Sequence, residues 1–378
     1  MTDSSFLEPA PTPLSRAASA SQWQLMWRQF RRHRLAMVSS VVLVLILLVA
    51  LFCEFLAPFS PEKFTPQFTY APPQAVHFFS RDAEGGLVFA PHVNGYTVKI
   101  DPIALRRTFV VDPEKAIPVG FFVKSEPYTM WGLFTLDRKF FGPTDEKDVI
   151  FLLGADRLGR DLLSRIIYGT RISVSIGLIG VALSLILGIV LGGISGYFGG
   201  WIDHAIQRVI EFIMSLPTTP LWLGLAAAMP TSWSPIKTYI AITIILSLIG
   251  WTSLARVIRG RFLALRTEDF VTAAMLDGAS QKRVIFRHMA PSFVSHIIAE
   301  ISLAIPTMIL AETALSFLGL GLQPPIVSWG VLLQEAQNIR SITTSPWLFA
   351  PGVAVVITVL ALNFVGDGLR DAADPYKH

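Results

Sequence analysis

Three acidic residues that lie within long apolar runs, Glu211, Glu300 and Glu312, are side chains that could move protons or ions in this protein. A charged side chain inside a bilayer is costly, so an intramembrane acid indicates an ion pathway or a substrate pathway. Glu300 and Glu312 share one apolar run, where a helix would separate them by about 18 Å, too far for a carboxylate dyad. The alternative for both is a structural hydrogen bond inside a helix bundle.

Motifs for other chemistry are missing from the sequence. It has no G-x-S-x-G nucleophile elbow, no H-E-x-x-H zinc motif and no G-x-x-x-x-G-K-[ST] phosphate loop. Its single cysteine, Cys53, excludes an intramolecular disulfide and a cysteine-based metal site. We predict no catalytic residue, no metal site and no ATP binding by the chain itself. The histidines are scattered along the chain: His33, His77, His92, His204, His288, His296 and His378.

The composition predicts a protein that crosses a membrane several times. Of the 378 residues, 52% are hydrophobic and 15% are charged, against about 25% charged in an average soluble domain. The mean hydropathy is +0.54. Several apolar runs are long enough to cross a bilayer, so we expect an all-α membrane protein with six spans. The spans run from about Leu35 to Ala57, Thr170 to Ile194, His204 to Ala228, Lys237 to Leu254, Ser292 to Phe317 and Trp347 to Gly366.

A charged stretch between two spans, Glu268–Pro291, is predicted to form a helix, a turn and a second helix. Glu268 and Asp269 favour a helix start, and Gly278 can adopt the left-handed conformation that ends a helix. Ser280 can cap the second helix, which Pro291 closes. The simpler interpretation is a basic loop that lies on lipid headgroups.

The positions of the basic residues predict the topology. Arginines precede the first span, and basic residues outnumber acidic ones around the Glu268–Pro291 stretch. By the positive-inside rule, that stretch and both termini lie in the cytoplasm. Residues 1 to about 22 are predicted to be disordered. The predicted division is a tail and interfacial segment at 1–34, a first helix at 35–57, an insert at 58–153 and a five-helix core at 154–378, with a cytoplasmic loop at 261–291.

Small residues at every fourth position of the second span predict a close helix–helix contact. A row of this kind lets two backbones approach within the membrane. The row consists of Gly180, Ser184, Gly188, Gly192, Gly196 and Gly200.

The insert at 58–153 is the only long polar region, and its short β-prone runs predict a small β-rich domain outside the membrane. Asn94-Gly95 is a hairpin-turn signal between the runs Gly86–Phe89 and Tyr96–Ile100. The alternative is a poorly ordered linker. A further hypothesis is that the insert shapes the docking of a partner outside the membrane or an outer gate.

Several motifs resemble ABC transporter permeases of the dipeptide/oligopeptide importer class, and more narrowly their C-type subunit. Ala273-Ala274, Gly278 and Pro291 resemble the EAA loop of that family, although Thr272 and Ala290 depart from its usual residues. The resemblance covers the core nearly end to end. It also includes Gly154, Asp156, Gly159, Arg160, Asp161, Arg171, Glu312, Gly319, Gly321, Trp329, Gly366, Asp367, Arg370, Asp374 and Pro375.

The resemblance implies a type I ABC importer permease in a bacterial inner membrane, with two ATPase subunits, a second permease subunit and an extracytoplasmic binding protein as partners. ATP and magnesium would be bound by the ATPase subunits, and nucleic acid is not an expected partner. The cargo would be a di- or oligopeptide, with nickel, opines or oligosaccharides as alternatives. Contact with the ATPase is expected at Asp269, Ala273, Ala274, Gly278, Ala279, Arg287 and Pro291.

Two questions stay open from the sequence. The residues that bind the cargo are not identified by any pattern. A secondary, ion-coupled transporter that uses Glu211, Glu300 or Glu312 remains the alternative from another functional class, and it predicts uptake without ATP.

Overall fold

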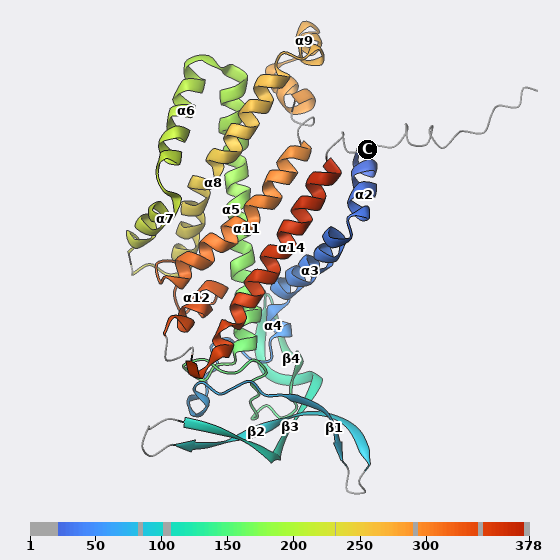
Figure 1. The fold of residues 1–378 in the computed structure, drawn as a ribbon, viewed down its shortest axis with the longest axis vertical. Helices are drawn as coiled ribbons and strands as arrows, with labels where there is room; N and C mark the ends of the chain where they lie inside the picture. The colour runs from blue at the N-terminus through green and yellow to red at the C-terminus, as the bar shows by residue number, and fades with distance from the viewer. Residues whose placement is uncertain are drawn as a thin grey trace, which may run out of the picture.

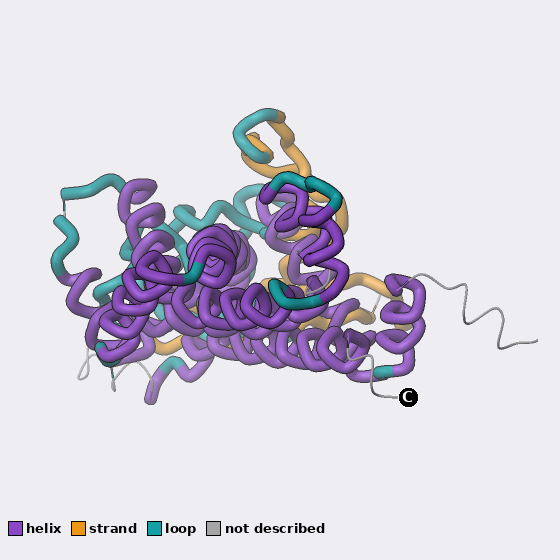
Figure 2. Tube along the Cα trace, turned by 90° about the horizontal axis from the view of Figure 1, so that it is seen from above, coloured by secondary structure: helices purple, strands orange, loops and turns teal. Residues whose placement is uncertain are grey.

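The computed structural model describes residues 22–81, 86–100, 107–230, 232–289, 294–338 and 343–373. Long helices run side by side, and a β-sheet lies at one end of them, opposite α9 (Figure 1). Seen from above, the helices form an elongated bundle with strands visible beyond its edge (Figure 2). A helical membrane fold with a β-rich insert is therefore confirmed.

Five described helices are long and apolar enough to cross a membrane. Each coincides with a predicted span, and α5 and α8 continue well beyond it. They are α3 (Arg34–Leu51), α5 (Leu162–Phe198), α8 (Pro235–Leu265), α11 (Val294–Phe317) and α14 (Ala350–Ala373).

The predicted third span is bent rather than straight. It consists of α6 (Gly200–Ser215) and α7 (Thr218–Ala227), which meet at 86° and make a sixth span only if they are counted together. The break falls at Leu216 and Pro217, where the backbone is extended (ψ 135° and 120°). A proline has no N–H to donate and disfavours helical geometry in the residue before it.

Shorter helices surround the bundle. Helix α2 (Gln22–Arg32) packs on α14 through Phe30 and Ala372, with Ala36 of α3 in the same cluster, and α4 (Cys53–Leu56) follows α3. The 3-10 helix η1 (Pro66–Phe68) follows α4. The charged stretch Glu268–Pro291 forms α9 (Asp269–Leu276), α10 (Gln281–Arg283) and the π-helix η2 (Val284–Met289). After α11 come α12 (Trp329–Gln334), η4 (Glu335–Gln337) and η5 (Pro346–Phe349).

The insert forms one antiparallel sheet in the order β1-β2-β3-β4. The strands are β1 (Val76–Arg81), β2 (Leu87–Ile100), β3 (Arg107–Met130) and β4 (Phe134–Pro143). The predicted hairpin turn at Asn94-Gly95 is wrong, because both residues lie inside β2. The pairing with β3 shifts register here, from Asn94↔Ala116 to Gly95↔Asp112, so the unpaired residues lie in β3. Neither Asn94 nor Gly95 has the positive φ that a two-residue hairpin turn requires, so pairing along the strand outweighed the local turn preference.

The sheet is fastened to the helices by its own core and by the segments that flank it. Phe59, Val93, Ile117 and Ile150 form a buried cluster between the sheet and these segments. The backbone N–H of Thr65 donates to the Gly159 carbonyl oxygen at 3.1 Å, just before α5 begins. The insert is therefore an ordered unit in contact with the helix bundle.

Candidate functional site

The hairpin formed by α9 and α10 has the turn chemistry that the sequence predicts. Gly278 has a φ of +78°. Its N–H donates to the Met275 carbonyl at 3.0 Å, and the N–H of Ala279 donates to the Ala274 carbonyl at 3.0 Å, which is a Schellman cap. Ser280 Oγ then accepts from the Arg283 N–H at 3.4 Å and caps α10. The predicted roles of Gly278 and Ser280 in the backbone are confirmed.

The predicted ATPase-contact residues divide between two faces of this hairpin. Asp269, Ala273, Gly278 and Arg287 are exposed, whereas Ala274 and Ala279 pack inward; Pro291 lies outside the described residues. Large apolar side chains are exposed beside them: Phe270, Met275 and Leu276, the last 83% exposed. The hairpin lies at the end of the bundle, where α9 projects beyond the long helices (Figure 1).

A buried cluster joins the inner face of the hairpin to α8. Val271 of α9 and Val284 and Met289 of η2 are fully buried against Leu254, Ile258 and Phe262 of α8. These six buried side chains form the apolar contact between the hairpin and α8.

The row of small residues lies along the contact between α5 and α8. A Cβ at Gly188 would meet Leu254, one at Gly192 would lie 2.5 Å from the Ala255 oxygen, and one at Gly196 would lie 2.7 Å from the Arg259 oxygen. Near Gly180 and Ser184, Ser247 Oγ donates to the Gly180 oxygen at 3.0 Å and Ser184 Oγ to the Ser247 oxygen at 3.1 Å.

Gly200 is not part of this contact, so its predicted packing role is wrong. Helix α5 ends at Phe198, and Gly200 begins α6 with a φ of +59°. A Cβ at Gly200 would meet nothing within 4 Å. The fourfold spacing continued past the end of the helix, where it no longer defines a face.

An ion pair that the sequence did not predict joins α6 to α8 near the hairpin. Asp203 accepts from Nε and Nη2 of Arg259, both at 2.6 Å. Ser195 of α5 also donates to Asp203. The signal that could have found the pair is an acid and a base at the ends of consecutive spans on the same side of the membrane.

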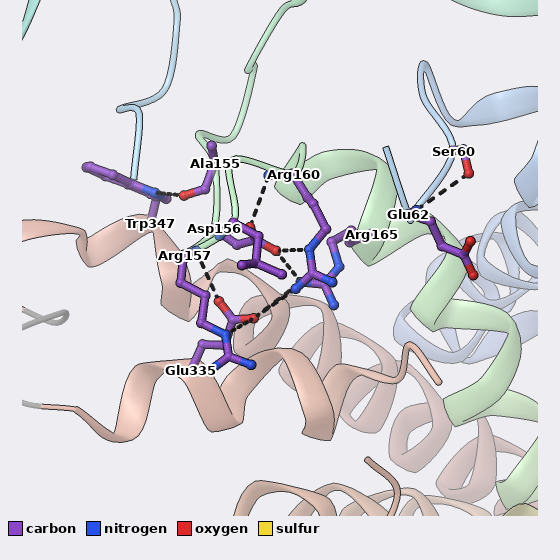
Figure 3. Close-up of polar contacts among 10 residues, drawn as sticks. Ser60, Glu62, Ala155, Asp156, Arg157, Arg160, Arg165, Glu335 and Trp347 are labelled. Carbon is purple, nitrogen blue, oxygen red and sulfur yellow. Dashed lines mark hydrogen bonds and ion pairs between the residues drawn. The ribbon is translucent and has the colours of Figure 1, made fainter. Parts of the chain in front are cut away.

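At the opposite end of α5, charged residues form a buried cluster (Figure 3). Asp156 is 1% exposed and accepts from Arg160 Nε at 2.6 Å and from Arg165. Nη1 of Arg165 and Nη2 of Arg160 each lie 3.3 Å from Oε1 of Glu335. Burial and the nearby Asp156 raise the pKa of Glu335. Glu335 follows α12, and no sequence pattern pointed to it.

The motif glycines around this cluster are needed for backbone reasons. Gly154 has a φ of +79° and lies against the Trp347 ring, and Gly159 has a φ of +73° with no room for a Cβ beside the Thr65 oxygen. Asp161 caps α5 by accepting from the Ser164 N–H at 2.8 Å. Burial raises the pKa of Asp161 to about 6.

Arg171 pairs with a residue that the sequence analysis missed. Its guanidinium binds both carboxylate oxygens of Glu54 in α4, and its Nε donates to the Ala50 oxygen at 2.8 Å. This pair therefore ties the end of the first span to the second.

Glu312 forms hydrogen bonds within the bundle. This is the structural role that the sequence analysis gave as the alternative to an ion pathway. It is fully buried, and its Oε1 accepts from Ser316 and Ser328, both at 2.8 Å. Ser173 of α5 donates to its Oε2 at 3.3 Å and accepts from the Trp329 N–H at 3.1 Å. The carboxylate thus joins α5, α11 and the start of α12.

The turn after α11 explains two further motif residues. Gly319 has a φ of +78° and forms a Schellman cap, in which the Leu320 N–H donates to the Leu315 oxygen at 3.0 Å. Gly321 lies against Ser316, where a Cβ would be 2.5 Å from the backbone nitrogen. The C-terminal motif is placed more simply: Gly366 packs on Ser302, Asp367 and Arg370 are exposed, and Asp374 and Pro375 lie outside the described residues.

The other two intramembrane acids have different surroundings. Glu211 is exposed and pairs with Arg208 at 2.9 Å. Glu300 lines a cavity of about 550 Å³ between α5, α7, α8 and α11, with Ser184, Trp222 and Met308 among the other lining residues. The lining is mostly apolar, and Glu300 is the one acidic side chain among the described lining residues. Among the described residues, no group of three His, Cys, Asp or Glu side chains is placed to hold a metal.

Comparison with known proteins gives two matching families. Residues 188–377 match the binding-protein-dependent transport system inner membrane component family, and residues 21–73 match the N-terminal TM domain of oligopeptide transport permease C. The glutathione transport system permease protein GsiD of Pectobacterium atrosepticum is 37% identical over 66% of this chain and 79% of its own length. The oligopeptide transport system permease protein OppC of Bacillus subtilis is 36% identical over 59% of this chain and 70% of its own.

A solved structure also matches. The methionine ABC transporter MetNI, in an inward-facing conformation, is 15% identical with a TM-score of 0.44, over 56% of this chain and 98% of the matched chain.

Proposed function

Because this chain belongs to the family of binding-protein-dependent transport system inner membrane components, we propose that it carries peptides across the membrane in an ATP-driven importer. The coarser function follows from the family: the chain is an inner membrane permease subunit of an ABC importer, which works with an ATPase and a binding protein. Curated relatives are glutathione, oligopeptide and dipeptide permeases, which supports a peptide cargo.

The cavity lined by Glu300 supports the same cargo. Its volume of about 550 Å³ falls within the range of small-molecule sites, roughly 300–1,000 Å³. A carboxylate in a mostly apolar lining would pair with the α-ammonium group that every free peptide carries. We therefore assign Glu300 to the recognition of the peptide N-terminus during passage.

The observation that carries the proposed coupling role is the exposed apolar surface of α9 on a hairpin fixed to α8. Phe270, Met275 and Leu276 are available to a groove on an ATPase subunit, while the opposite face is buried on α8. ATP and magnesium bind to that partner, and this chain holds no cofactor of its own. The full importer has two permease subunits, two ATPase subunits and one binding protein.

Force applied to the hairpin would pass to the membrane helices as a rigid movement. Helix α8 is held to α5 by the glycine contact and to α6 by the Asp203–Arg259 pair. Closure of the ATPase pair would therefore move these helices together and switch the cavity between its inward and outward openings. The hairpin and both termini face the cytoplasm, and the sheet lies outside, where it contributes to binding-protein docking or to the outer gate.

Reconstitution tests the proposed function. Proteoliposomes that contain the permease pair, the ATPase subunits and the binding protein should take up a labelled dipeptide only with ATP and magnesium. Uptake without ATP, driven by a membrane potential, would favour the ion-coupled alternative. A screen of ligands against the binding protein would separate peptides from nickel, opines and oligosaccharides.

A further inference from the structure

The turn between β3 and β4 exposes apolar side chains next to the end of a membrane helix. Leu133 is 74% exposed, Phe134 57% and Trp131 42%. From Tyr128 to Leu136 the hairpin carries no charged residue. A soluble turn is normally polar, because its backbone and side chains face water. We propose that this hairpin tip, Trp131–Phe134, inserts into the outer leaflet of the lipid bilayer.

The position of the tip follows from its contacts with the first span. Trp131 Nε1 donates to the carbonyl oxygen of Leu51, the last residue of α3, at 2.6 Å. The ring of Trp131 also lies 5.7 Å from that of Phe52. At about 1.5 Å per residue, α3 rises roughly 26 Å from Arg34 to Leu51, which is most of the ~30 Å thickness of the hydrocarbon core. The tip therefore lies at the outer boundary of the hydrocarbon.

The exposed tip continues a surface that already faces lipid. Leu45, Leu48 and Leu51 of α3 are each between 43% and 56% exposed, as expected for a helix in contact with acyl chains. Charges begin at this level: the Glu54–Arg171 pair of α4 and α5 lies beside the tip, and the backbone N–H of Trp131 donates to Glu54 Oε1 at 3.4 Å. Tryptophan is enriched at this boundary, since its ring is apolar and its N–H needs a polar partner.

The backbone of the turn gives a separate reason to assign a role to Trp131. Trp131 and Gly132 have φ values of +53° and +71°, and Leu133 N–H donates to the Met130 oxygen at 3.0 Å. Turns of this kind favour Asn or Asp before Gly. A large side chain in the left-handed region is strained, because its Cβ approaches the backbone carbonyl oxygen. Turn formation does not explain a tryptophan here, whereas anchoring at a membrane boundary does.

Spin labelling of single-cysteine variants in the assembled transporter in proteoliposomes tests the proposal. Cys53 is replaced by alanine, and a nitroxide is attached at Leu133→Cys or, as a second position, Phe134→Cys. Collisions with oxygen, which partitions into lipid, are compared with collisions with a water-soluble nickel chelate. The control is Leu87→Cys: Leu87 is as exposed as Leu133, at 75%, but β2 begins at the end of the sheet away from the helices (Figure 1).

We expect oxygen collisions to exceed chelate collisions at the two tip positions and the order to reverse at Leu87. Equal access of the chelate to the tip and to Leu87 would overturn the proposal. A tip label that is exposed to the chelate and becomes shielded only when the binding protein is added would also overturn it, and would assign the tip to that partner. None of these readouts depends on transport, so they are independent of the cargo.

Discussion

The carboxylate of Glu335 accepts a hydrogen bond from Nη1 of Arg165 at 3.3 Å, and the two residues are 170 positions apart in the chain. Arg165 is 1% exposed, so its charge depends on Glu335 and Asp156 for compensation. The contact joins the first turn of α5 to the segment after α12 (Figure 3). It closes the end of the bundle that lies beside the insert.

Replacing this acid should loosen that closure. Glu335→Gln removes a charged acceptor from a buried guanidinium, which should lower the free energy of unfolding by about 1.5–3 kcal/mol. The measurement is thermal unfolding of the purified protein in detergent. Glu114→Gln, at an exposed position of β3, is the matched control and should change stability by less than about 0.5 kcal/mol. Equal unfolding of both variants would show that Glu335 is not needed for closure.

The contact between α5 and α8 should be sensitive to a single methyl group. Gly192→Ala places a Cβ 2.5 Å from the Ala255 oxygen, and overpacking of this kind costs about 1–3 kcal/mol. Gly260→Ala, on α8 itself, meets nothing within 4 Å and is the control. Thermal unfolding should show a lower midpoint for the first variant and no loss for the second. The reverse order would mean that the helices do not meet along this row.

Transport should depend on the backbone of Gly278 in the hairpin formed by α9 and α10. Its φ of +78° is costly for a β-branched residue, whereas the space around it is open. Gly278→Val should therefore abolish ATP-dependent uptake while the protein still inserts into the membrane. Gly278→Asn should keep most uptake, because asparagine accepts the left-handed conformation. Normal uptake by the valine variant would remove the hairpin from the coupling mechanism.

Recognition of the cargo should depend on the charge of Glu300. Glu300→Gln should raise the KM for a dipeptide about tenfold or more, as expected for loss of a charge-assisted hydrogen bond. An N-acetylated dipeptide lacks the ammonium group and should be unaffected by the substitution. Glu211→Gln changes an exposed acid that pairs with Arg208 and serves as the control. The KM values of the wild type and of both variants are measured from uptake in proteoliposomes. An unchanged KM of Glu300→Gln for the dipeptide would assign recognition elsewhere.

Lys139 should make stability depend on pH. Its Nζ donates to the backbone carbonyl oxygen of Glu54 at 2.5 Å and lies 3.9 Å from the Tyr128 ring centre. Burial lowers the pKa of Lys139 from 10.5 to about 8. Between these two values the unfolded chain binds more protons at Lys139 than the folded chain does, so stability rises with pH.

The check is the unfolding midpoint of the wild-type protein and of Lys139→Met at pH 7.5 and pH 9.5. The wild-type midpoint should rise relative to that of the variant. The corresponding free energy of unfolding should rise with a slope of up to about 1.4 kcal/mol per pH unit. Parallel pH profiles would contradict a buried, depressed lysine.

Local patterns in the sequence determined the membrane class, the apolar spans and the turn chemistry of the hairpin. Apolar length decides whether a helix can cross a bilayer, and Gly278 and Ser280 act on neighbouring backbone groups, so both can be read without knowledge of the fold. The row from Gly180 to Gly196 was readable for the same reason, because it follows the period of one helix. The prediction was wrong for Gly200, because the helix ends before that residue.

The tertiary structure alone decided which charges meet. Glu335 with Arg165, Glu54 with Arg171 and Asp203 with Arg259 join separate elements. It also decided that Glu312 makes hydrogen bonds within the bundle, whereas Glu300 lines a cavity. An acid in an apolar run looks the same in either case, because its environment is set by the helices that pack around it. Those contacts arise between residues far apart in the chain, and no local spacing records them.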